Sequence, residues 1–263
     1  MQHGDEDTLA IDLTASWRSS FETIRRRGWR RILVIGASDR GKSTYCQALA
    51  DALRSTGVGV GFVDGDIGQK DVGPPAAVSL VFPKSATPFS ALSPVAHFFV
   101  GAVSPMGRFS ELVIGTRRLA DEAASDFVVI DTPGLVSGSG RTLQALQIEA
   151  LQPDAIVAIE AQNELSPVCR THAHLNILRL PASTRARAKS PAQRRRRRQA
   201  AFQSHFRDAQ TLALPLDDLV FQRTLLFSGE PTTDPRNCHT ERVEDLTPGV
   251  SKTGVTIERR HLK

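Results

Sequence analysis

The sequence contains little of what secreted, zinc-binding or membrane proteins use. Its three cysteines among 263 residues are scattered and form no C-x-x-C pair, which disfavours a zinc site or a disulfide framework and suits a reducing compartment. No apolar run approaches the ~20 residues of a membrane-spanning helix. The first residues are acidic and include no apolar signal segment. We therefore expect a cytoplasmic protein that does not bind membranes.

Acidic residues are absent from one long segment, 165–207. This segment holds eleven of the 33 Lys and Arg residues, and five of them are consecutive arginines at 194–198. Elsewhere the 28 Asp and Glu residues outnumber the remaining basic ones, so the positive charge of the chain is localised. Localised positive charge favours a polyanionic partner such as nucleic acid. A solvated charge run or a localisation signal would produce the same pattern.

The strongest motif is G-x-x-x-x-G-K-[ST], the phosphate-binding P-loop, at 36–44. A strand pattern at 31–35 precedes it and a helix pattern at 45–54 follows, which is the context that the motif requires. Loop amides would bind the phosphates of ATP, Lys42 would reach the β- and γ-phosphates, and the Ser43 hydroxyl would ligate Mg²⁺. The expected nucleotide-binding residues are Gly36, Ala37, Ser38, Asp39, Arg40, Gly41, Lys42, Ser43 and Thr44.

Carboxylates follow two other predicted strands. Asp131 comes directly after the apolar stretch 127–130, as in a Walker B strand, and would hold the metal opposite Ser43. Asp64 and Asp66 follow an earlier strand, and the carboxyl ends of parallel strands meet at the edge where ligands bind. One of these two carboxylates could activate an acceptor hydroxyl. Asp-Gly-Asp sequences are also common as turn caps, and the pattern alone leaves both interpretations open.

The sequence Asp-Thr-Pro-Gly at 131–134 also resembles the D-x-x-G motif of GTPases. A GTPase would add a guanine-reading N-K-x-D motif after a later strand. The predicted strand 155–159 is instead followed by Glu-Ala-Gln-Asn at 160–163. This favours ATP, or a site tolerant of the base, over strict use of GTP.

Strand and helix patterns alternate along most of the chain. The alternation predicts an α/β protein of the P-loop NTPase fold, with a mostly parallel sheet and helices on both faces. We expect a lead-in segment at 1–28, a P-loop domain at 29–210, and a short, partly disordered segment at 211–263. The expected strands are 31–35, 57–63, 76–82, 96–103, 127–130, 155–159 and 175–180, the expected helices are 17–27, 45–54, 111–124, 142–151 and 192–209, and a terminal strand pair is 212–216 with 219–227.

The stretch 63–69, Val-Asp-Gly-Asp-Ile-Gly-Gln, followed by Gly-Pro-Pro at 73–75, resembles the polynucleotide 5′-hydroxyl kinase family. This family includes the kinase subunit of the eukaryotic pre-mRNA cleavage factor, the nucleolar rRNA-processing kinase, and smaller archaeal and bacterial members. In the family, the Asp of a D-x-G-Q tetrad is the general base. The resemblance therefore implies that Asp66, rather than Asp64, is the base and that Gln69 contacts the acceptor.

The basic segment also resembles a part of this family, the lid that closes over the nucleotide. Aligning the aromatic residues of 202–206 with the end of that lid places Lys189, Arg194 and Arg198 on its three basic positions, within a lid at 183–207. Lys189 stands in place of an arginine and supplies a point charge instead of a planar fork. From the pattern alone, the lid and a solvated charge run are equally good explanations.

Two further segments resemble family segments near the substrate. The stretch 101–105 looks like the family's clasp, and 130–136 looks like its Walker B segment. The resemblance implies substrate contacts for Ser104 and Leu135. Leu135 stands where eukaryotic members have a tryptophan that stacks on the substrate base.

The resemblance implies a short member of the family, without the additional N-terminal domain of the larger members. The implied activity is transfer of the ATP γ-phosphate to the 5′-hydroxyl of RNA, with DNA as a second substrate. Two other classes stay open: a catalytically weak ATP-binding scaffold of an RNA-processing assembly, and an ATPase or GTPase switch. The sequence identifies no protein partner.

Overall fold

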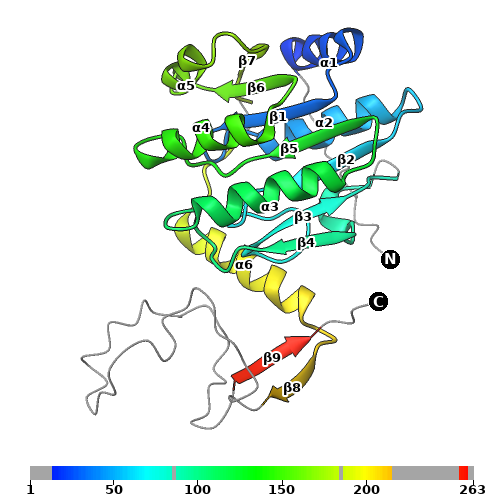
Figure 1. The fold of residues 1–263 in the computed structure, drawn as a ribbon, viewed down its shortest axis with the longest axis vertical. Helices are drawn as coiled ribbons and strands as arrows, with labels where there is room; N and C mark the ends of the chain where they lie inside the picture. Colours follow the sequence, from blue (N-terminus) through cyan, green and yellow to red (C-terminus); the bar gives the residue numbers. More distant parts are fainter. Residues whose placement is uncertain (1–13, 85–86, 184–185, 215–254, 260–263) are drawn as a thin grey trace, which may run out of the picture. The chain divides into compact units, whose positions relative to one another are not determined.

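The computed structural model describes residues 14–84, 87–183, 186–214 and 255–259 (Figure 1). Contacts group the chain into two compact units, Met1–Phe202 and Gln203–Lys263. The first unit contains the large sheet and the helices that cover it, and the boundary lies inside the last helix.

The first unit is built on a seven-stranded sheet with the order β4-β3-β2-β5-β1-β6-β7 (Figure 1). Neighbouring strands from β2 to β7 in this order are parallel, whereas β3 is antiparallel to both β2 and β4. The sheet is therefore mostly parallel, which confirms the predicted fold class. The strands are β1 (Arg31–Gly36), β2 (Val60–Asp64), β3 (Ala77–Val81), β4 (Ala96–Phe99), β5 (Phe127–Asp131), β6 (Ala155–Glu160) and β7 (Ile177–Pro181).

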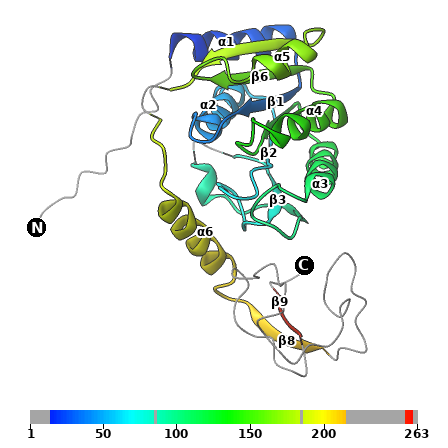
Figure 2. The ribbon, with the colours of Figure 1, turned by 90° about the vertical axis from the view of Figure 1, so that its left-hand side faces the viewer.

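Helices cover both faces of the sheet, as Figure 2 shows for α2 on one side and α3 and α4 on the other. The helices are α1 (Ala15–Arg27), α2 (Lys42–Arg54), α3 (Phe109–Glu122), α4 (Ser139–Leu151), α5 (Ser166–Thr171) and α6 (Pro191–His205), with a 3₁₀ turn, η1 (Phe89–Ala91). Two apolar clusters fill the layers, one under α1 and α2 and the other under α3, α4 and α5. No helix in the described parts of the chain is long and apolar enough to cross a membrane.

The first helix shows how the lead-in segment joins the domain. Thr14 caps α1 by accepting a hydrogen bond from the Trp17 amide, and Trp17 and Phe21 pack their rings on Tyr45 of α2. The Trp17 indole also donates to the carbonyl oxygen of Pro181 at 3.1 Å. The helix expected over 17–27 is therefore confirmed, beginning at Ala15, and its aromatic side chains pack on the helix that follows the P-loop.

Some predicted elements differ from those in the structure. The strand expected over 96–103 ends at Phe99, because the amides of Val100 and Gly101 both donate to the carbonyl oxygen of Ala76 and turn the chain away from the ladder. The helix expected over 192–209 ends at His205.

The second unit holds a two-stranded antiparallel sheet of β8 (Gln210–Leu214) and β9 (Val255–Arg259). The strand expected at 212–216 overlaps β8. Its expected partner, 219–227, lies outside the described residues. The segment expected to be partly disordered contains β9, where Val255 and Ile257 alternate with polar residues in a strand pattern, and the expectation for the rest of it stays a prediction.

Candidate active site

The predicted site residues gather at the carboxyl edge of the parallel strands. The P-loop follows β1, a tight loop at 64–72 follows β2, and Asp131 ends β5 beside Asp64, its register partner on β2. A cleft of about 380 Å³ opens between these loops and the start of α6. A hollow of about 500 Å³ lies at the opposite edge of the sheet, among Val58, Gly59 and Asp126, and contains no P-loop residue. The cleft is lined by Ser38, Asp39, Gly41, Lys42, Ser43, Thr44, Gln47, Asp66, Gln69, Asp71, Phe89, Ser90, Lys189, Arg194 and Arg197.

The P-loop leaves the first amides of α2 free to bind an anion. Gly41 has a φ of 89°, which glycine adopts without strain, and no side chain caps the start of the helix. Uncapped amides and the helix dipole together favour phosphate at this position. Lys42 is buried and its ammonium donates to the carbonyl oxygen of Ala37 at 3.2 Å. Of the other predicted P-loop residues, Gly36, Ala37 and Arg40 do not line the cleft, and Arg40 pairs with Glu164 at 3.1 Å.

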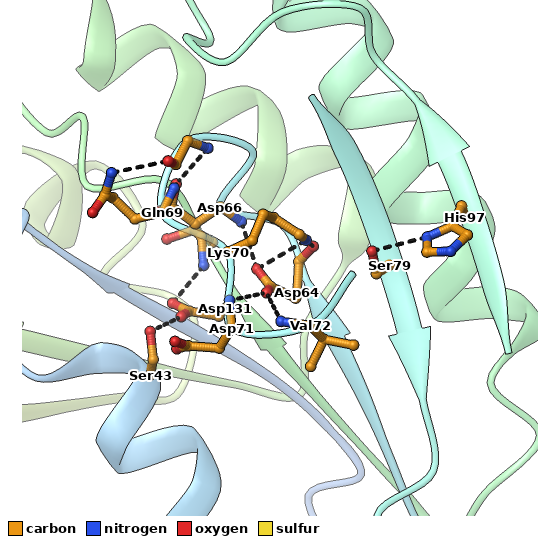
Figure 3. A network of polar contacts seen from close by, with 12 residues as sticks. Ser43, Asp64, Asp66, Gln69, Lys70, Asp71, Val72, Ser79, His97 and Asp131 are labelled. Carbon is orange, nitrogen blue, oxygen red and sulfur yellow. Dashed lines mark hydrogen bonds and ion pairs between the residues drawn. The ribbon is translucent and has the colours of Figure 1, made fainter. Parts of the chain in front are cut away.

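The Walker B carboxylate meets the P-loop hydroxyl as predicted. Ser43 Oγ donates to Asp131 Oδ2 at 2.7 Å, and the amide of Thr132 donates to Oδ1 at 2.8 Å (Figure 3). Burial raises the pKa of Asp131 to about 7, although the nearby Lys42 ammonium opposes this rise. The buried Asp131 carboxylate has little compensating positive charge, and the Ser43 hydroxyl lies beside it. Oxygen ligands of this kind suit a hard divalent cation. The residues present therefore fit Mg²⁺.

Asp64 organises the loop that follows β2 (Figure 3). Its carboxylate is buried, forms an ion pair with buried Lys70 at 3.2 Å, and accepts the amides of Asp71 and Val72 at 2.9 Å and of Asp66 at 3.1 Å. Burial raises the pKa of Asp64, and the Lys70 ammonium opposes the shift. With these contacts made inside the loop, Asp64 is a structural carboxylate.

Asp66 both caps a turn and lines the cleft. Its Oδ1 accepts the amides of Gly68 and Gln69, each at 3.0 Å, so the turn-cap interpretation describes a real contact. No described residue donates a hydrogen bond to its second oxygen, Oδ2. The turn therefore holds the side chain by one oxygen, and the cap is compatible with a chemical role for the other.

The basic segment contacts two carboxylates of the cleft. Arg194 pairs with Asp39 of the P-loop at 2.5 Å, and Lys189 lies 3.7 Å from the same carboxylate. Arg197 pairs with Asp71 at 3.3 Å. Of the three predicted lid cations, Lys189 and Arg194 line the cleft and Arg198 does not, whereas Arg197, which was not among them, does. Residues three positions apart share a helix face, so Arg197 lies on the same side of α6 as Arg194. Asp71 lies on that side and pairs with Arg197.

The predicted substrate-binding residues are only partly brought together. Gln69 lines the cleft, and its amide nitrogen donates to the carbonyl oxygen of Gly68 at 2.9 Å. Ser104 is exposed outside the cleft. Leu135 packs against the core beneath α4, where the buried Gln144 amide donates to the carbonyl oxygens of Pro133 and Leu135 at 3.4 and 3.2 Å.

Two loops of the site meet by backbone contact. Gly134, which follows the Walker B strand, lies against Ser38 of the P-loop, and a Cβ atom at 134 would be 2.5 Å from the Ser38 amide nitrogen. Only glycine permits such an approach. This contact sets the distance between the P-loop and the segment that contains Leu135.

Besides Arg197, sequence reasoning missed four residues that line the cleft: Gln47, Asp71, Phe89 and Ser90. Gln47 could have been found, because it lies four residues after Ser43 on the same face of α2. Asp71 follows the D-x-G-Q tetrad closely but has no motif of its own. Phe89 and Ser90 belong to a Pro- and Ser-rich stretch to which the sequence assigns no strand, helix or motif.

Comparison with known proteins places the chain among relatives. Residues 36–208 match the family described as mRNA cleavage and polyadenylation factor CLP1 P-loop. A polyribonucleotide 5′-hydroxyl-kinase from Pyrococcus furiosus is 38% identical over 216 residues, which cover 81% of this chain and 61% of the relative. One from Methanocaldococcus jannaschii is 34% identical over 206 residues, covering 76% and 56%. The chain thus spans about 60% of the length of the curated relatives it matches.

A solved structure has the same fold at low sequence identity. Clp1p, in a complex with Pcf11p, superposes with a TM-score of 0.58 at 13% identity, covering 77% of this chain and 58% of that one. This likeness shows the fold alone. The match over 36–208, which includes the P-loop, the D-x-G-Q tetrad and the run of arginines, shows the family: the chain belongs to the CLP1 P-loop family.

Proposed function

We propose that the chain is an ATP-dependent polynucleotide 5′-hydroxyl kinase that acts on RNA, with DNA as a second substrate. The observation that carries this proposal is that Asp66 shares one cleft with Lys42 and Ser43, under the cations of a basic segment. An ATPase or GTPase switch has no acceptor hydroxyl to activate, so it needs no carboxylate placed like Asp66 opposite the phosphates. The names of the archaeal relatives support the same activity.

On the donor side, Lys42 and the amides of the P-loop hold the β- and γ-phosphates. Ser43 and Asp131 would hold Mg²⁺, which when bound neutralises charge on the phosphate oxygens. Lys189, Arg194 and Arg198 are the proposed lid cations, which offset the charge on the transferring phosphoryl group. The contact between Arg197 and Asp71 adds a fourth cation to this set.

On the acceptor side, Asp66 is the proposed base. The 5′-hydroxyl oxygen forms a bond to the γ-phosphorus, the bond from that phosphorus to the bridging oxygen breaks, ADP leaves, and the hydroxyl proton passes to the Asp66 carboxylate. Gln69, Ser104 and Leu135 are the proposed contacts to the acceptor. Leu135 offers no ring for stacking, so we expect acceptor binding to depend on backbone charge and to discriminate weakly between RNA and DNA.

We place this reaction in the cytoplasm as part of the proposal. Cys46 and Cys169 are free thiols, which is the state that a reducing compartment maintains.

The test is transfer of labelled γ-phosphate from ATP to a 5′-hydroxyl RNA oligonucleotide by the full chain, with release of inorganic phosphate measured in parallel. A 5′-phosphorylated oligonucleotide of the same sequence is the control and should accept no label. Label at the 5′ end supports the proposal. Release to water alone would indicate an ATPase, and ATP binding without turnover would indicate a scaffold; either result contradicts the proposal.

A further inference from the structure

Asp39, the fourth residue of the P-loop, has contacts that binding of phosphate does not explain. Its carboxylate side chain is only 9% exposed and accepts the Lys189 amide at 3.1 Å and the Arg194 Nη2 at 2.5 Å. The Lys189 ammonium lies 3.7 Å away. The backbone of Asp39 is in the left-handed region, with φ of 58°, and the side chain contacts the lid. A carboxylate beside the phosphate cradle would by itself disfavour the binding of phosphate. Its contacts with two cations therefore indicate a role other than phosphate binding.

The contacts fix the plane of the Arg194 guanidinium. Its Nε donates to the carbonyl oxygen of Lys189 at 3.2 Å, and its Nη2 donates to Asp39. No described residue accepts a hydrogen bond from its Nη1, and the side chain lines the cleft. A guanidinium held by two of its nitrogens keeps the third ready to donate to a phosphoryl oxygen.

We propose that Asp39 is a positioning residue, which docks the lid on the P-loop and holds Arg194 and Lys189 at the rim of the phosphate cradle. Asp39 itself does not touch the reacting atoms. Its kinetic effect therefore passes through Arg194 and Lys189, and this part rests on the proposed kinase activity. The docking itself stands on the contacts of Asp39 alone.

A second ion pair, between Arg197 and Asp71, fastens the same helix to the acceptor-side loop. Asp71 is held in place because its amide donates to Asp64. The lid thus contacts one loop on the donor side and one on the acceptor side. Asp39 is the more informative residue to change, since its partners come from both the helix and the segment before it.

The first experiment measures docking without turnover. Asp39→Asn removes the charge, keeps the shape, and suits a left-handed backbone that Asn adopts readily. Limited trypsin digestion of the full chain, without nucleotide, reports cleavage within 194–198 by mass spectrometry. Loss of the ion pairs should speed this cleavage about fivefold, the effect of roughly 1 kcal/mol on opening. Glu122→Gln is the matched control, because it breaks a carboxylate–arginine pair with Arg118 on the surface of α3.

The second experiment measures transfer. Asp39→Asn should lower kcat about tenfold, as expected for a displaced catalytic group, with the KM for ATP unchanged or lower. In a Lys189→Ala, Arg194→Ala background, Asp39→Asn should cause no further loss of kcat, because the carboxylate acts through these two cations. A role in fold stability alone would instead lower the thermal midpoint and add to the effect of the two cation substitutions.

The outcomes separate this inference from the proposed function. If the wild-type chain transfers no phosphate but Asp39→Asn still speeds tryptic cleavage, the kinase proposal fails while the docking role stands. Wild-type cleavage and wild-type kcat in Asp39→Asn overturn the inference. A rise in kcat overturns it too, since it would mean that Asp39 withholds Arg194 from the phosphates.

Discussion

The P-loop and the lid border the same cleft but are opposite kinds of structure. The P-loop side is built from the ends of central strands, and its key contact, between Ser43 and Asp131, joins two buried elements. The lid side is built from charges on a helix with no buried residue, and its contacts are ion pairs with Asp39 and Asp71. The phosphate cradle is thus formed by folding itself, whereas lid placement depends on a few charges.

Loss of the Lys42 ammonium from the phosphate cradle should have the largest effect on activity. Lys42→Ala removes the ammonium beside the phosphates, and we expect transfer to fall by about 10³-fold or more. The rate of label transfer to a 5′-hydroxyl RNA measures this. Wild-type activity in a folded Lys42→Ala protein would contradict the role proposed for Lys42 and place the essential charge in the lid.

The acidic residue that ends β2 and the one that follows it, Asp64 and Asp66, should separate into a structural and a chemical residue. Asp66→Asn cannot accept a proton, so kcat should fall about 10²-fold or more while ATP binding and the thermal midpoint are kept.

Asp64→Asn should instead destabilise the fold by about 3–5 kcal/mol, because it leaves buried Lys70 without its charged partner. Denaturant titration and single-turnover kinetics on both variants distinguish the two roles. A stable Asp64→Asn protein without activity, beside a mild Asp66→Asn protein, would reverse the assignment of the base.

The buried amide under the acceptor segment should have an intermediate effect. Gln144→Leu removes the donor to the carbonyl oxygens of Pro133 and Leu135, which should raise the KM for the RNA acceptor about tenfold and leave that for ATP unchanged. Gln147→Leu is a matched control, since Gln147 is equally buried one turn along α4 and has no described partner. Equal effects of the two variants would show that general packing, and not the hydrogen bonds, matters.

The smallest effect should come from arginines outside the cleft. Arg195 and Arg196 are exposed and do not line it. Replacing both by Ala should weaken RNA binding and flatten its salt dependence, by about one unit of slope for each RNA phosphate that is no longer neutralised, with kcat kept. Fluorescence anisotropy with matched RNA and DNA across a salt series measures this. A strong, salt-insensitive preference for one sugar would contradict backbone-driven binding.

Sequence reasoning was accurate where the chemistry is local to a motif. The P-loop and the strand before Asp131 are each defined by a few neighbouring residues, and their meeting follows from the parallel sheet. It was less accurate for Arg197 and Asp71, because their contact depends on where a helix and a loop far apart in the chain lie. Leu135 shows a third limit, since the pattern identified its segment but not that its half-buried side chain also packs against the core.

The backbone contact between Gly134 and Ser38 has a mechanical consequence. Packed atoms have no free space between them, so a movement of the P-loop at Ser38 has to be accompanied by a movement at Gly134. The two loops are therefore mechanically coupled, and neither can move alone. A nucleotide that moves the P-loop would in this way also move the segment that contains Leu135, a proposed contact to the acceptor.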